Sequence, residues 1–160
     1  MILSILLAFF LQASPTPQTL PFEPSVLGLL NDAEKNALIR SSNLQARTQA
    51  LLAAAKRLLK EAEQMLKTDK PRAMLDSLES YTRILESCEK LMHAQPPENK
   101  RPNYKKQEIE LRRQLKTLDD LLAGSDLEEK PAIQEVIRTA AGLRTHFLTT
   151  FFGKDSLKRP

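Results

Sequence analysis

The side chains in this sequence that could bind a metal ion or take part in redox chemistry are those of His93, His146 and Cys88. If both histidines lie on helices that run in the same direction, they sit about 33 Å and about 30 Å along those helices at ~1.5 Å per residue, so they share a level. Two imidazoles and a carboxylate, here Glu98 or Glu34, are typical ligands of zinc. One hypothesis is therefore a small metal-responsive or redox-responsive protein that uses His93, His146 or Cys88.

The alternative interpretation is that both histidine side chains face solvent and bind no metal. Neither His93 nor His146 occupies a core-facing position of its apolar stripe, and the second and fourth of four sequential helices are expected to lie diagonally. We therefore assign no metal ligand and no cofactor, and keep His93 and His146 as candidates only.

The single cysteine allows no intrachain disulfide and no multi-cysteine zinc site. It belongs to an apolar stripe whose members step alternately by four and three residues: Met74, Leu78, Tyr81, Leu85, Cys88 and Met92. This position predicts a small buried group rather than a reactive thiol. If Cys88 were exposed in an oxidising compartment, it would form a disulfide-linked dimer.

Motifs that position catalytic groups are missing from the sequence. Its four glycines are isolated, so no phosphate-binding loop is indicated, and neither H-E-x-x-H, G-x-S-x-G nor C-x-x-C-H occurs. Carboxylates alternate with Lys and Arg, and no two of them are set apart for acid–base work. We expect a protein that is not an enzyme.

A basic segment from Lys100 to Lys116 is the main candidate for contact with a partner. Seven cations stand there against Glu108 and Glu110, an excess of five, and an aromatic ring is added. Cations at the start of a helix oppose its dipole, so an anionic partner would be stabilised there. The residues assigned to this contact are Lys100, Arg101, Tyr104, Lys105, Lys106, Arg112, Arg113 and Lys116. The alternative is a solvated helix start with scattered charge.

The first residues indicate export. An apolar run from Ile2 to Leu11 precedes Ala13, and as a helix it would reach roughly 18 Å, short of the ~30 Å hydrocarbon layer. Residues 1–13 are therefore predicted to be a signal peptide, and no integral membrane span is expected after processing. No Lys or Arg precedes the run, so a buried N-terminal helix is the alternative.

Residues 14–30 are predicted to form a proline-rich spacer. Four prolines within ten residues, at positions 15, 17, 21 and 24, favour an extended chain, and one short helical turn is possible within residues 25–30. Asn31 and Glu34 then form a predicted capping box. The helix that follows reaches about Lys67, with a weak point at residues 40–43 where it bends or restarts.

Three further helices are predicted. Pro71 opens the second, over residues 71–94, with Thr68 or Asp69 as its cap. The third runs from about Pro102 to Ala123, and a Ser125–Glu128 capping box precedes a fourth that starts near Pro131 and stops at Gly153. Residues 154–160 are a frayed tail. Because the connections are short, residues 31–153 are predicted to form an all-α, antiparallel up-down-up-down four-helix bundle.

Composition agrees with a single helical domain. The chain has 160 residues, 5% aromatic side chains and a net charge of +4, which is mild for a nucleic-acid-binding protein. We therefore expect an exported, periplasmic or extracellular, non-enzymatic bundle that contacts a protein or an envelope component, with an acidic surface as a candidate partner. The alternative is an intracellular protein that binds nucleic acid or another polyanion through Lys100–Lys116. Export makes nucleic acid the less favoured partner.

Overall fold

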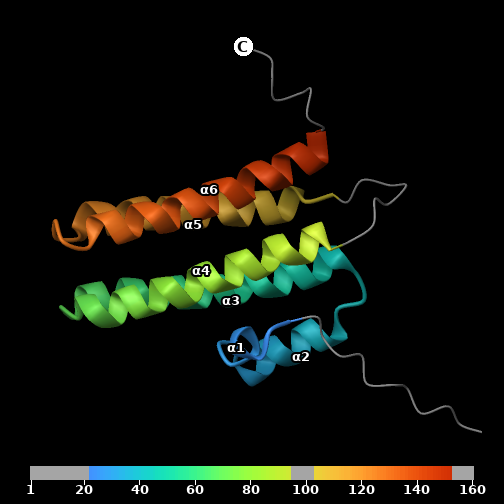
Figure 1. The fold of residues 1–160 in the computed structure, drawn as a ribbon, viewed down its shortest axis with the longest axis horizontal. Helices are drawn as coiled ribbons and strands as arrows, with labels where there is room; N and C mark the ends of the chain where they lie inside the picture. The colour runs from blue at the N-terminus through green and yellow to red at the C-terminus, as the bar shows by residue number, and fades with distance from the viewer. Residues whose placement is uncertain (1–21, 95–102, 153–160) are drawn as a thin grey trace, which may run out of the picture.

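The computed structural model describes residues 22–94 and 103–152. These residues form six helices and no strand (Figure 1): α1 (Pro24–Leu27), α2 (Asp32–Arg40), α3 (Leu44–Lys67), α4 (Pro71–His93), α5 (Lys105–Gly124) and α6 (Lys130–Phe152). The all-α prediction is confirmed. The predicted signal peptide and the tail at 154–160 lie outside the described residues.

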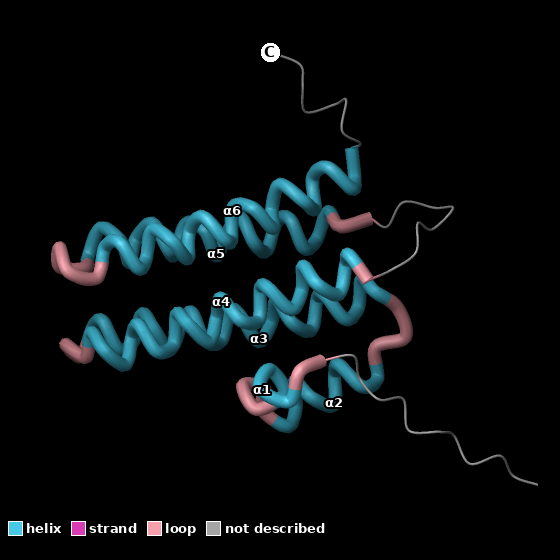
Figure 2. Tube along the Cα trace, in the orientation of Figure 1, coloured by secondary structure: helices cyan, strands magenta, loops and turns pink. Residues whose placement is uncertain are grey.

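The four long helices form two hairpins. α3 packs against α4 and α5 packs against α6, each across a short turn (Figure 2). The hairpins then lie on each other, with α3 beside α5 and α4 beside α6. Both of these pairs run in the same direction (Figure 1).

The expectation that the second and fourth long helices are diagonal is therefore wrong, because α4 and α6 are direct neighbours. Residues 94–104 connect the two hairpins, and a chain of this length spans more than ~30 Å when extended. This length is sufficient for α5 to begin next to the start of α3 instead of next to the end of α4.

Two glutamines show how α5 is aligned on α3. The Gln107 side chain donates to the carbonyl oxygen of Gln45 at 3.0 Å, and the Gln114 side chain donates to that of Leu52 at 3.1 Å. Donor and acceptor are 62 residues apart in both cases, so the parallel pair keeps one register over a heptad.

The buried residues of the hairpin α3–α4 follow the predicted stripes. All six members of the α4 stripe are buried, and so are Ala55 and Ala62 of α3. These small side chains let the two helices approach closely, as the alternation of leucine with alanine predicts.

The predicted first long helix is divided at residues 41–43, the weak point in the sequence. The Asn43 side chain accepts a hydrogen bond from the amide of Ala46 at 2.8 Å and so opens α3 as a new helix. The capping box of Asn31 and Glu34 at the start of α2 is confirmed, with bonds of 2.8 and 2.9 Å.

The short helical turn expected in the spacer is α1, which contacts α4. Val26 of α1 and Leu30 just after it are buried among the core residues. The later residues of the predicted spacer therefore pack onto the hairpin α3–α4.

Two predicted caps are wrong. Lys70 stands before α4 without a side-chain cap, since the Thr68 hydroxyl donates to Gln64 instead and Asp69 has a φ of 54°. The hydroxyl of Ser125 donates back to the carbonyl of Leu121 at 2.8 Å, and its side chain is buried. Ser125 therefore closes α5 and does not cap α6, which begins at Lys130.

None of the described helices combines the length and the apolar character that a membrane crossing requires.

Candidate functional site

Of the basic segment, residues 105–116 lie on α5, which begins at the same end of the molecule as α3 (Figure 1). Its described cations are all exposed: Lys105, Lys106, Arg112, Arg113 and Lys116. Lys100 and Arg101 lie outside the described residues, so the structure does not place them.

Tyr104 does not belong to this surface. Its side chain is buried, and its ring lies 5.1 Å from that of Phe147 on α6 at a tilt of 42°. The prediction that Tyr104 presents an exposed aromatic ring to a partner is wrong, because only 1% of the residue is exposed. Tyr104, the residue just before α5, instead packs its ring against α6, where apolar burial favours an aromatic side chain.

The two carboxylates of the segment are already engaged. Glu108, whose side chain is only 8% exposed, accepts hydrogen bonds from Arg112 at 2.8 Å and from Arg144 of α6 at 2.9 Å. Burial alone would raise the pKa of Glu108, but the two guanidinium groups outweigh it and hold the pKa below its usual value. Glu108 is therefore a fixed anion that joins α5 to α6.

Glu110 is shared in a similar way. Lys56 of α3 lies 3.2 Å from one of its oxygens, and Arg113 lies 4.0 Å from the other. With both acids occupied, Lys105, Lys106 and Lys116 have no ion pair within residues 22–94 and 103–152.

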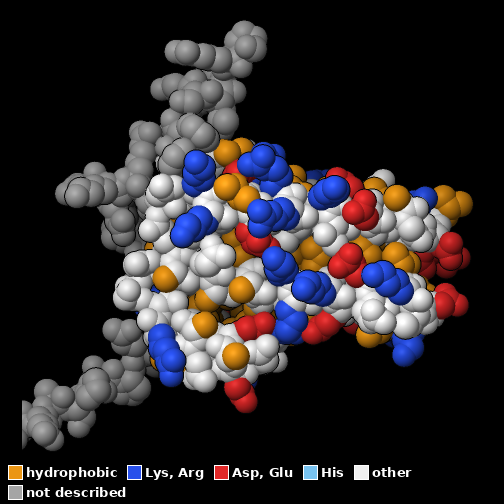
Figure 3. Space-filling view, turned by 180° about the vertical axis from the view of Figure 1, so that it is seen from behind, with side chains coloured by type: hydrophobic (Ala, Val, Ile, Leu, Met, Phe, Trp, Pro, Cys, Tyr) orange, Lys and Arg blue, Asp and Glu red, His pale blue; other side chains and the backbone are white. Residues whose placement is uncertain are grey.

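Lysines of α3 extend this surface. We define the basic face as Lys105, Lys106, Arg112, Arg113 and Lys116 of α5 together with Lys56 and Lys60 of α3. Figure 3 shows Lys and Arg side chains spread over this side of the molecule, with acidic side chains between them. The α3 members could not be found from the sequence, because they depend on α3 being the neighbour of α5.

A pocket of about 450 Å³ lies between α5 and α6 next to the basic face. Its lining consists of Tyr104, Lys105, Glu108, Ile109, Arg112, Arg144, Phe147 and Leu148. The lining thus combines apolar side chains with the carboxylate of Glu108, the two arginines paired with it, and Lys105, which has no ion pair in the described part of the chain. A hollow of this kind fits a ligand that carries both an apolar group and a negative charge.

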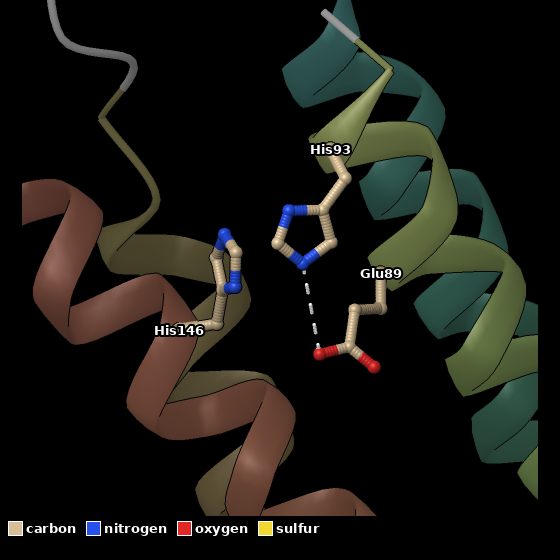
Figure 4. Close-up of side chains that lie close together, drawn as sticks. All are labelled: Glu89, His93 and His146. Atoms are coloured by element: carbon tan, nitrogen blue, oxygen red, sulfur yellow. Dashed lines mark ion pairs between the residues drawn. The ribbon is translucent and has the colours of Figure 1, made fainter.

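His93 and His146 lie against each other at the end of the stacked hairpins. Their ring centroids are 4.6 Å apart and their planes are nearly perpendicular, at 88° (Figure 4). The prediction that the two histidines share a level is confirmed, and the side-by-side packing of α4 and α6 brings the rings together.

Among the described residues, the carboxylate that clusters with these rings is that of Glu89, one turn before His93 on α4. A Glu89 oxygen lies 3.9 Å from His93 Nε2. Glu34 is wrong as the third ligand, because it is bonded to Arg57, and Glu98 lies outside the described residues. The four-residue spacing of Glu89 and His93 was the signal in the sequence that pointed to the correct carboxylate.

His146 is partly buried at this contact. Burial lowers the pKa of its imidazole, and the adjacent His93 lowers it further, while Glu89 acts in the opposite direction. The neutral form, which carries a lone pair, is therefore favoured at His146.

Cys88 lies in the core, as its place in the stripe predicts. Its side chain is fully buried, and the sulfur is 3.8 Å from the carbonyl oxygen of Thr48. Burial raises the pKa of the thiol. The redox hypothesis loses its reactive thiol, because thiolate formation and solvent access are both suppressed.

Comparison of the chain with known protein families, with curated proteins and with solved structures gives no match. Functional inference therefore depends on the basic face, the pocket beside it and the histidine pair.

Proposed function

We propose that this protein is an exported, periplasmic or secreted, non-enzymatic helical bundle that binds an acidic segment of a partner protein at the first half of α5. In this proposal, the four long helices, which alternate in direction along the chain and form two stacked antiparallel hairpins, serve as a rigid support. The observation that carries the proposal is the set of exposed lysines Lys105, Lys106 and Lys116, which have no ion pair in the described part of the chain.

Exposed cations alone give little affinity, since water and salt screen them. They do guide an acidic partner to the surface and raise the rate of association. The pocket adds the apolar part of the interaction, because Ile109 and Leu148 line it together with Lys105. An apolar side chain of the partner would enter the pocket while neighbouring carboxylates contact the lysines.

The apolar run at residues 2–11 supports an exported location. Outside the cytoplasm, an acidic protein segment is a more accessible anion than nucleic acid. The same cations would serve an intracellular polyanion, so the test must separate these two ligands. Mass spectrometry of the protein isolated from its native cell, with an N-terminus near Ser14, would support export, whereas retention of Met1 would contradict it.

Binding is tested with two fluorescent probes and the full chain. The first probe is a peptide in which glutamates surround one phenylalanine, and the second is single-stranded oligothymidine. We expect the peptide to bind, and the affinity to fall at least ~10-fold between about 50 and about 200 mM salt. Preference for the oligonucleotide, or no binding of the peptide at the lower salt concentration, would contradict the proposal.

The matched variants reverse charge at two helix starts. Lys105→Glu with Lys106→Glu changes the basic face, whereas Lys70→Glu with Arg72→Glu makes the same change at the start of α4, at the opposite end (Figure 1). We expect only the first pair to abolish peptide binding. Equal loss in both pairs would show that net charge, and not the basic face, determines binding.

A further inference from the structure

The cluster of Glu89, His93 and His146 offers three metal-binding side chains from two helices. One ligand atom from each residue can be chosen so that all three lie within 4.8 Å of one another. Figure 4 shows the imidazoles of α4 and α6 facing each other with the carboxylate beside them. No other group of three His, Cys, Asp or Glu residues in the described ranges meets this condition.

The distances are close to those that a metal ion requires. In a tetrahedral zinc site with bonds of ~2.0–2.1 Å, ligand atoms lie roughly 3.3 Å apart. Ligand atoms of this cluster, which lie within 4.8 Å of one another, must therefore approach by up to about 1.5 Å. Such a movement needs only side-chain rotation, because the side chains of His93 and Glu89 are 63% and 46% exposed.

The backbone around the cluster also favours a cation. α4 ends at His93, and the parallel helix α6 ends at Phe152, so both C-terminal ends lie at the same end of the molecule. The C-terminal end of a helix carries a partial negative charge that stabilises positive ions. The end of α4, where His93 itself lies, therefore adds to the charge of Glu89.

We propose that Glu89, His93 and His146 form a binding site for one divalent transition-metal ion, such as Zn²⁺, with water in the remaining coordination position. Two imidazoles and one carboxylate are a common ligand set for zinc and its neighbours in the first transition row. Because His93 belongs to the hairpin α3–α4 and His146 to the hairpin α5–α6, the ion would join the two hairpins.

Calorimetric titration of the tag-free full chain with Zn²⁺ tests this site. A histidine tag must be absent, because it would bind the ion itself. We expect one Zn²⁺ per chain and a higher melting temperature in its presence, since an ion that binds only the folded chain stabilises it. Co²⁺ should give the visible absorption of a four-coordinate site. An unchanged melting temperature, with no heat of binding, would overturn the proposal.

Four single substitutions assign the ligands. Glu89→Gln, His93→Gln and His146→Gln should each weaken Zn²⁺ binding by at least ~10-fold, as the loss of one ligand predicts. Glu86→Gln, also on α4 and exposed, is the matched control and should bind as the unmodified chain does. Circular dichroism verifies that each variant is folded. Retention of full affinity in both histidine variants, or equal loss in the control, would show that the ion binds elsewhere.

Discussion

Arg57 of α3 and Glu34 of α2 are joined by two hydrogen bonds, with Nε 2.7 Å from Oε1 and Nη2 3.0 Å from Oε2. The same guanidinium donates to the carbonyl oxygen of Leu29 at 2.8 Å, and Glu34 also accepts from the amide of Asn31. One side chain of α3 thus holds the segment between α1 and α2 together with the start of α2. This contact gives the N-terminal helices a defined place on the hairpin α3–α4.

Replacement of Arg57 should therefore destabilise the protein. We expect Arg57→Ala to lower the free energy of unfolding by about 1–3 kcal/mol, because Glu34 would lose both charge-assisted bonds. Arg57→Lys should recover only part of this loss, since an ammonium group cannot make the paired contact. Arg138→Ala, which removes an exposed ion pair with Glu135, is the control and should change stability by less than ~1 kcal/mol. Urea denaturation measures all three variants.

Stability should also fall in acid. Burial would raise the pKa of Glu34, but the hydrogen bonds from Arg57 and the Asn31 amide outweigh it and hold the pKa below its usual value, as happens for Glu108. Because the pKa of Glu34 is lowered in the folded chain, the ionised carboxylate stabilises the fold. This stabilisation is fully present above the unfolded pKa of about 4.3. It is then lost as the pH falls through the lowered folded value.

The urea midpoint between pH 7 and about pH 3 measures this effect, with Glu34→Gln as the comparison. The variant should be less stable at neutral pH and should lose less stability on acidification. An equally steep acid dependence in the variant would show that Glu34 does not contribute to it.

The hydroxyl of Tyr81 is a second group whose removal bears on stability. It is buried in the core and has no hydrogen-bond partner among the described residues. A buried unbonded hydroxyl costs about 1–3 kcal/mol, so Tyr81→Phe should leave stability unchanged or raise it by up to ~1 kcal/mol. Thermal or urea denaturation measures the change. A clear loss of stability would reveal a partner for the hydroxyl, such as a bound water molecule.

Labelling of Cys88 should report unfolding. The thiol is buried and its pKa is raised by burial, so a thiol reagent such as Ellman's should not react with the native chain. In denaturant the same reagent should react completely, and non-reducing electrophoresis of the native protein should show no disulfide-linked dimer. Rapid labelling without denaturant would contradict the buried position.

Most of the core could be predicted from the sequence, because helical periodicity determines which face of each helix is apolar. The stripe from Met74 to Met92 is the clearest case, and every member is buried. Periodicity does not determine which helices become neighbours. Periodicity therefore predicts that His93 and His146 share a level but does not predict the contact between α4 and α6 that brings their rings together.

Polar residues at helix interfaces were missed for a related reason. Gln107 and Gln114 are buried, although their side chains suggest a solvated surface. The side-chain nitrogen of each donates to a backbone carbonyl on α3, which offsets part of the cost of burial, whereas the Oε1 atom of each has no hydrogen-bond partner among the described residues. Their seven-residue spacing is a helical signal, but it becomes meaningful only when the partner helix is known. The burial of Tyr104 likewise depends on a neighbouring helix, because its ring packs on Phe147 of α6.

The two-hairpin arrangement also has a kinetic consequence. Turns of a few residues bring α3 to α4 and α5 to α6, whereas the contact of Gln107 with Gln45 closes a loop of 62 residues. Short loops lose less chain entropy on closure, so we expect each hairpin to assemble before the two dock. Chains rich in such local contacts reach the native state quickly, and here the docking of preformed hairpins would determine the overall rate.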